Sequence, residues 1–84
     1  MEIRKVYVRV TVEFSKEGKM LPKSLKWEDE TVFEIDKVVD VQRAASLKGG
    51  GIGMRYTIRI KGKETFLWYE EPSWFVEGKY YNND

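Results

Sequence analysis

Paired carboxylates are the first candidates for chemistry in this sequence, because general acid and base catalysis needs two such groups close together. They occur side by side at Glu28-Asp29-Glu30 and at Glu70-Glu71. The 84 residues include no histidine and no cysteine, which removes the commonest general base, thiolate nucleophiles and the usual zinc ligands. Neighbouring carboxylates on a strand point to opposite faces, so both clusters are typical of solvated turns. We therefore expect a protein that is not an enzyme and that has no cofactor or metal.

A glycine cluster, Gly49-Gly50-Gly51-Ile52-Gly53, is the second candidate for holding a ligand. Phosphate-binding loops are rich in glycine and lead into a helix whose first N–H groups bind the anion. Here the spacing differs, because a G-x-G-x-x-G pattern starting at Gly49 would need a glycine where Met54 stands. The segment that follows, MRYTIRI, alternates like a strand. The cluster is therefore predicted to connect two strands of a hairpin.

Basic and aromatic residues gather in the middle of the chain, although the net charge is only +1. Between Lys37 and Lys61 the bases are Lys37, Arg43, Lys48, Arg55, Arg59 and Lys61, against the single acid Asp40. Single-stranded nucleic acids are bound by such bases together with aromatic rings that stack on the nucleobases. The candidate binding face consists of Arg43, Arg55, Arg59, Lys61, Tyr56, Phe66 and Trp68. In the alternative interpretation, these arginines pair with acids across strands and the aromatic rings form the core.

The elements that would position these residues are strands. The segment from Ile3 to Phe14 alternates strictly, with Val6, Val8, Val10, Val12 and Phe14 on one side and charged or polar residues on the other. Further strands are expected over Thr31–Asp36, Val38–Leu47, Met54–Lys61, Glu64–Glu70 and Trp74–Glu77, with Pro72 breaking the chain before the last. The two segments around Asp36 and Lys37 could be one bent strand.

Residues Ser15 to Glu30 contain Gly18 and Pro22 and many charges, which predicts a long connection over one end of the sheet. Its apolar anchors are Met20, Leu21, Leu25 and Trp27. A short helix around Ser24 to Asp29 is the alternative for this region.

Two hairpins determine which side chains share a face. A hairpin around the glycine cluster that pairs Leu47 with Met54 also opposes Arg43 to Ile58. For the next hairpin, a two-residue turn at Lys61-Gly62 leaves Phe66 and Trp68 on the face of the arginines. A three-residue turn with a bulge sends both aromatic residues into the core, and the sequence leaves this choice open.

The fold class predicted from these elements is all-β: a small antiparallel meander of five to six strands, curled or closed as an SH3-like barrel. Residues 1–78 are expected to form a single β domain and residues 79–84 a frayed polar tail. No apolar run approaches the roughly 20 residues of a membrane span, so we expect a cytoplasmic protein without membrane contact.

The function expected from these residues is that of a non-catalytic binding module. Trp27, Trp68, Tyr69, Trp74 and Phe75 offer more aromatic surface than a core of this size absorbs, and exposed aromatic rings mark interfaces. The partner we expect is another protein, with a second copy of the chain as the simplest case. Single-stranded nucleic acid is the alternative partner.

The segment from Pro22 onward resembles a family of short, uncharacterised proteins of Gram-positive bacteria. The resemblance rests on Pro22, Leu25, Trp27-Glu28-Asp29, Ile35-Asp36, Val38, Asp40, Arg43-Ala44-Ala45-Ser46, Gly50, Gly53, Arg55-Tyr56-Thr57, Glu70 and Trp74-Phe75. It implies a small β fold in a bacterial cytoplasm and assigns no activity, substrate or partner. In this family a glycine is expected after the Trp-Glu-Asp triplet, where this chain has Glu30, so a looser turn is expected there.

Overall fold

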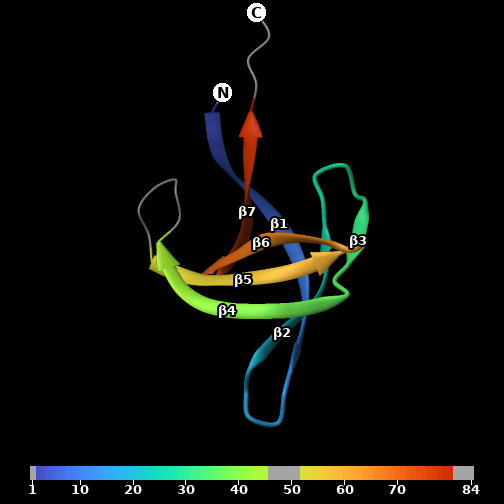
Figure 1. Ribbon diagram of the computed structural model, residues 1–84, viewed down its shortest axis with the longest axis vertical. Helices are drawn as coiled ribbons and strands as arrows, with labels where there is room; N and C mark the ends of the chain where they lie inside the picture. Colours follow the sequence, from blue (N-terminus) through green and yellow to red (C-terminus); the bar gives the residue numbers. More distant parts are fainter. Residues whose placement is uncertain (1, 46–51, 81–84) are drawn as a thin grey trace, which may run out of the picture.

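The described part of the chain consists of antiparallel β-strands (Figure 1). The computed structural model describes residues 2–45 and 52–80. Its strands are β1 (Glu2–Phe14), β2 (Met20–Lys26), β3 (Val32–Glu34), β4 (Lys37–Ala45), β5 (Ile52–Ile60), β6 (Lys63–Glu70) and β7 (Ser73–Tyr80). The predicted all-β class is confirmed, with seven strands in these ranges rather than five or six. The predicted pairing of Leu47 and most of the glycine cluster fall outside the described residues.

The sheet curls until its two end strands are joined by the chain itself. Its strand order is β3-β2-β1-β7-β6-β5-β4, so β3 and β4 lie at opposite ends, yet only Ile35 and Asp36 separate them. The Ile35 N–H donates to the Lys23 carbonyl at 2.9 Å, and the Asp36 N–H donates to the Arg59 carbonyl at 2.8 Å. This bent segment therefore connects β2 to β5 and gives the sheet a barrel-like shape (Figure 1). Of the alternatives that the sequence left open here, the structure has two strands, β3 and β4, rather than one bent strand.

Strand β1 is long because it pairs with two neighbouring strands, one after the other. Its first half pairs with β7 as far as Val8, opposite Trp74, and its second half pairs with β2 from Arg9, opposite Lys26. The hairpin of β1 and β2 projects from the barrel-like body (Figure 1), which leaves Phe14 at its tip 66% exposed. Phe14 therefore does not join the buried side predicted for this strand, because nothing in the described structure covers the hairpin tip.

The core lies on the inner, concave side of the sheet. Its buried members are Val8, Leu25, Tyr56, Ile58, Leu67 and Trp74. Partly buried residues, among them Val10, Val12 and Met20, pack around this cluster. Burying a side chain of this kind contributes about 1.5–3 kcal/mol, so this cluster is the main support of a chain without disulfides.

Strand β2 occupies the region that the sequence predicts to be a long connection or a short helix, and both expectations are wrong. Pro22 is tolerated because the β1–β2 register shifts here: Thr11 pairs with Ser24, but Val12 pairs with Pro22, which leaves Lys23 as the extra residue of a bulge. Leu25 is buried, as expected for an anchor.

The hairpin of β4 and β5 has a different register from the predicted one. Arg43 pairs with Met54 rather than with Ile58, because β5 begins at Ile52 and takes residues of the glycine cluster into the strand. From Asp40 to Ala45 the register shift is an even number of residues, so these side chains keep their predicted faces. Strand β7 also runs longer than predicted, because its pairing with β1 continues to Tyr80, inside the predicted tail.

Candidate functional site

The turn between β5 and β6 fixes the face on which the aromatic residues of β6 lie. Lys61 and Gly62 have φ angles of 51° and 78°, and Ile60 pairs with Lys63 across them. Two left-handed residues match a type I′ two-residue turn. Of the two alternatives left open by the sequence, this is the one in which Phe66 and Trp68 share a face with Arg55. We call this side of β1, β7, β6 and β5 the outer face.

On the outer face, the two arginines of β5 are engaged by the chain itself. The Arg55 guanidinium lies 4.5 Å from the ring centroid of Phe66, and its Nη2 donates to Gln42 Oε1 at 3.2 Å. The Nη2 of Arg59 donates to Glu64 Oε2 at 3.1 Å. Both contacts are exposed, so each contributes modestly to stability. The arginines are therefore oriented along the sheet rather than held out toward solvent.

A row of aromatic rings crosses the outer face from β6 to β1. The Trp68 and Phe75 rings are stacked with centroids 6.0 Å apart and planes at 3°, and Tyr7 lies 5.8 Å from Phe75. Trp68 and Phe75 are buried, whereas Phe66 at one end is 46% exposed and Tyr7 at the other is 61% exposed. Of these four rings, Phe66 and Tyr7 are therefore the ones exposed enough to stack on a partner.

A lysine–glutamate ion pair lies on the outer face beside Phe75. Lys5 Nζ donates to Glu70 Oε1 at 2.8 Å and lies 4.7 Å from the Phe75 ring centroid. The hydrogen bond to Glu70 raises the pKa of Lys5 above its usual range. This carboxylate of the Glu70-Glu71 pair is thus bound to a cation of its own chain.

The remaining residues of the candidate binding face lie elsewhere. Tyr56 is buried in the core, where its ring centroid is 5.2 Å from that of Trp74, and burial raises the pKa of its phenol. Arg43 is exposed on the side of β4 that faces the core, since it pairs with Met54. Lys61 stands at the turn, 5.6 Å from the Phe33 ring centroid. The structure therefore places Arg55, Arg59, Phe66 and Trp68 together and separates the other three from them.

The acidic triplet forms a turn whose carboxylates have separate contacts. Glu28 lies 3.7 Å from an Arg4 nitrogen, and Glu30 lies 3.3 Å from Lys26 Nζ. Asp29 accepts from Thr31, which lowers the pKa of its carboxyl group. Glu30 has a φ of 73°, a conformation that favours glycine, and the turn is closed by backbone hydrogen bonds of 3.0 and 2.8 Å. Within the described residues, no three acidic side chains are grouped to hold a metal ion.

Strand β4 is the most exposed long strand of the described structure. It pairs with β5 and with no other described strand, so its outer edge presents unpaired backbone groups. Val39 and Val41 are each 41% exposed, although Val41 lies opposite the buried Tyr56. The register shift between Val38 and Asp40 marks a bulge at Val39. We call the unpaired edge of this strand, from Lys37 to Ala45, the β4 edge.

The sequence signal for the β4 edge is weak. The segment VVDVQRAA mixes apolar and polar residues without the strict alternation of β1, so periodicity alone does not say which face or edge it exposes.

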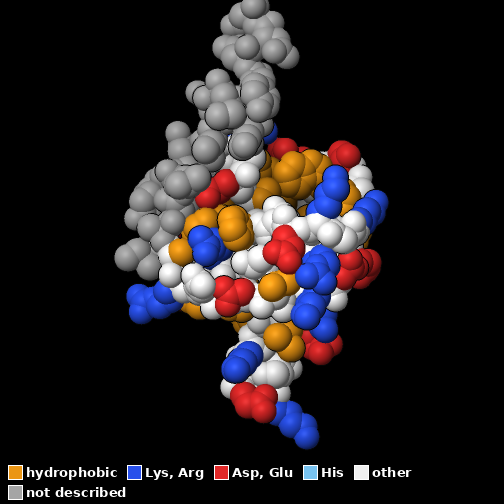
Figure 2. Space-filling model, in the orientation of Figure 1, with side chains coloured by type: hydrophobic (Ala, Val, Ile, Leu, Met, Phe, Trp, Pro, Cys, Tyr) orange, Lys and Arg blue, Asp and Glu red, His pale blue; other side chains and the backbone are white. Residues whose placement is uncertain are grey.

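On the visible side of the molecule, basic and acidic side chains are interspersed with apolar patches (Figure 2). The charge asymmetry of the sequence therefore produces no single basic surface on that side.

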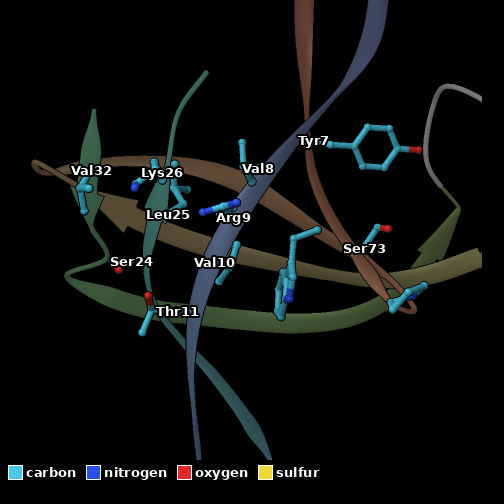
Figure 3. A pocket seen from close by; sticks show the side chains of 12 residues that line it. Tyr7, Val8, Arg9, Val10, Thr11, Ser24, Leu25, Lys26, Val32 and Ser73 are labelled. Carbon is cyan, nitrogen blue, oxygen red and sulfur yellow. The ribbon is translucent and has the colours of Figure 1, made fainter. Parts of the chain in front are cut away.

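The described part of the structure also contains concavities. A small one, of about 220 Å³, is lined by Tyr7, Arg9, Lys26, Trp27, Glu28 and Glu30. Two others have larger volumes. One, of about 620 Å³, opens beside β1 and β2 and is lined by Arg9, Lys26, Tyr7 and others (Figure 3). The second, of about 400 Å³, is lined mainly by apolar residues, including Trp27 and Phe33. We call the one of about 620 Å³ the β1–β2 concavity.

Comparisons of the chain with protein-family models, curated proteins and solved structures give no match. Within residues 2–45 and 52–80, no helix is long and apolar enough to cross a membrane.

Proposed function

We propose that this protein is a non-catalytic protein-interaction module that adds a partner strand along the β4 edge, and that the partner is a second copy of the chain. The observation that carries this proposal is a nine-residue strand, Lys37–Ala45, that is paired on one side only within the described sheet. An edge strand of this length is a template for another strand, which gains backbone hydrogen bonds as it pairs.

Exposed apolar side chains support the same proposal. Val39 and Val41 are each 41% exposed, whereas the other β4 valine, Val38, is partly buried and packs against the core. Covering apolar surface contributes about 25 cal/mol per Å² removed from water. A partner strand beside β4 would cover both valines while it satisfies the backbone groups of the edge.

The sequence of β4 is compatible with pairing to itself. A two-fold axis through Val41 places Val41 beside its own copy and opposes Asp40 to Gln42 and Lys37 to Ala45. In this antiparallel arrangement no two like charges stand directly opposite each other, which would be destabilising. The charge pattern therefore favours a second copy over a strongly charged partner.

Nucleic acid, the alternative predicted from the sequence, has less support from the predicted face. Arg59 is paired with Glu64, Arg55 is stacked on Phe66, and Trp68 is buried.

The SH3-like type of barrel, the cytoplasmic location and the membership in the Gram-positive family remain predictions that rest on the sequence.

Sedimentation velocity over a series of protein concentrations tests the proposal. We expect a monomer–dimer equilibrium with a dissociation constant between about 1 µM and about 1 mM, as for a small interface. Val41→Lys should abolish the dimer, because it places two ammonium groups side by side at the two-fold axis.

The matched control is Val32→Lys, the same substitution at a valine that is 52% exposed on β3. It should leave the dissociation constant unchanged. A chain that stays monomeric throughout the series would contradict the proposal, and so would equal losses of dimer in the two variants.

A further inference from the structure

The β1–β2 concavity opens where β1 leaves β7 and begins to pair with β2. Its lining comes from β1, from β2 and β3, and from Pro72 and the first two residues of β7. Its volume of about 620 Å³ is in the range of small-ligand sites. Arg9 lies at the point where β1 changes from pairing with β7 to pairing with β2, directly opposite Lys26 on β2. The floor is apolar and includes the buried Leu25 and Trp74.

The lining of the concavity includes two cations and no acid, while Glu28 and Glu30 line an adjoining small concavity together with Tyr7, Arg9 and Lys26. Like charges opposite each other on neighbouring strands are destabilising, yet Arg9 and Lys26 occupy such a pair. Lys26 is partly neutralised by Glu30 at 3.3 Å, whereas Arg9 has no hydrogen bond or ion pair within the described part of the chain. None of the residues that line the concavity is acidic, and Ser24 and Thr11 add hydroxyl groups beside the two cations. This donor set suits an anionic oxygen group such as a phosphate.

An exposed ring stands at the other end of the concavity. Tyr7 is 61% exposed and points away from Arg9, toward the side where Ser73 lies, while Arg9 points toward Lys26 (Figure 3). The Tyr7 ring is in contact with Phe75 and so is oriented by the sheet. An exposed aromatic ring is a stacking platform for a nucleobase.

We infer that the β1–β2 concavity binds a nucleoside phosphate, with the phosphate against Arg9 and Lys26 and the base against Tyr7. The ligand could be a free nucleotide or one nucleotide of a single strand, and the chemistry of recognition is the same. This site is separate from the β4 edge, because none of the residues that line it belongs to β4.

Amide chemical-shift titrations of the labelled protein test this inference with three probes: inorganic phosphate, adenosine monophosphate and a mixed-sequence single-stranded DNA. Adenosine monophosphate should shift the amides of Val8–Thr11 and Ser24–Lys26 and bind more tightly than inorganic phosphate. Tighter binding of the single strand at the same amides would identify nucleic acid as the source, and equal affinity would identify the free nucleotide.

The variants separate a built site from general attraction to positive charge. Arg9→Gln and, independently, Lys26→Gln should each weaken binding of adenosine monophosphate, the first about tenfold or more, as expected for loss of a charge-assisted hydrogen bond. Lys16→Gln removes one positive charge from an exposed residue outside both the concavity and the β4 edge and should change nothing. Tyr7→Leu should weaken the nucleotide but not inorganic phosphate.

Two results would overturn the inference. One is the absence of shifts at these amides with all three probes at low ionic strength. The other is an equal effect of Arg9→Gln and Lys16→Gln, which would mean that the anions respond only to net charge.

Discussion

Gly53 lies in β5, where any side chain would meet the neighbouring strand β6. A Cβ atom at this position would be pressed against the backbone carbonyl of Tyr69 and would lie 2.7 Å from Cγ of Glu70. The backbone at Gly53 does not need a left-handed conformation, so the residue is required by close packing. Gly53 is therefore a residue of the strand itself, whereas the sequence placed it in the connection between the two strands.

Replacement of Gly53 by alanine should lower the free energy of unfolding by about 2 kcal/mol, because the backbone of β6 must move to admit the methyl group. Gly78→Ala is the control, since its Cβ would meet only a side-chain methyl group of Val6 at 3.3 Å. Urea unfolding of both variants gives the comparison. A loss at Gly53 no larger than that at Gly78 would show that the contact with Tyr69 does not limit this position.

Single residues also show what alternation can predict and what it cannot. The pattern MRYTIRI places Arg55 and Arg59 on one face and Tyr56 and Ile58 on the other. The inclusion of Tyr56 in the candidate binding face is therefore wrong, and the ring is buried beside Ile58. The burial of Trp68 does not follow, because it depends on stacking against Phe75 of a different strand. The period of a sequence predicts which residues of one strand share a face. Contacts between strands can be predicted only when the register of their pairing is known.

At the level of elements, the long strand β1 was predictable because its alternation is strict and its apolar residues are β-branched. Strand β2 was not, because Pro22 and a dense run of charges are typical of a loop, and only pairing with β1 through a bulge makes it a strand. The turn at Lys61-Gly62 lies between these cases. Its residues permitted two registers, and the left-handed φ angles of both residues correspond to the shorter turn.

Different responses to substitution are expected at the two turn positions from this geometry. Gly62→Ala should lower the free energy of unfolding by about 1 kcal/mol, because alanine is strained at a φ of 78°. Lys61→Gly relieves a similar strain at 51° and loses a weak contact with Phe33, so its effect should stay within about 0.5 kcal/mol. Thermal or urea unfolding measures both. Equal destabilisation by the two variants would contradict the type I′ turn.

At the level of the whole molecule, the bent segment between β3 and β4 determines the shape. Because Ile35 bonds to β2 and Asp36 bonds to β5, one short connection joins both ends of the sheet and curls it around the core. The sequence predicted the all-β class and left open whether the region around Asp36 and Lys37 is one bent strand or two strands. It did not predict the unpaired edge of β4, because which strand is left at an edge depends on every pairing in the sheet. The β4 edge and the β1–β2 concavity are both products of this arrangement.

Amide hydrogen exchange as a function of protein concentration tests the central claim, that the β4 edge is an interaction surface, most directly. Backbone groups that pair with a second copy exchange more slowly as the dimer forms. We predict that, as the protein concentration rises, protection increases in β4 from Val38 to Ala44, while the amides of β1 near Phe14 stay unchanged. Exchange in β4 that is independent of concentration would contradict the claim.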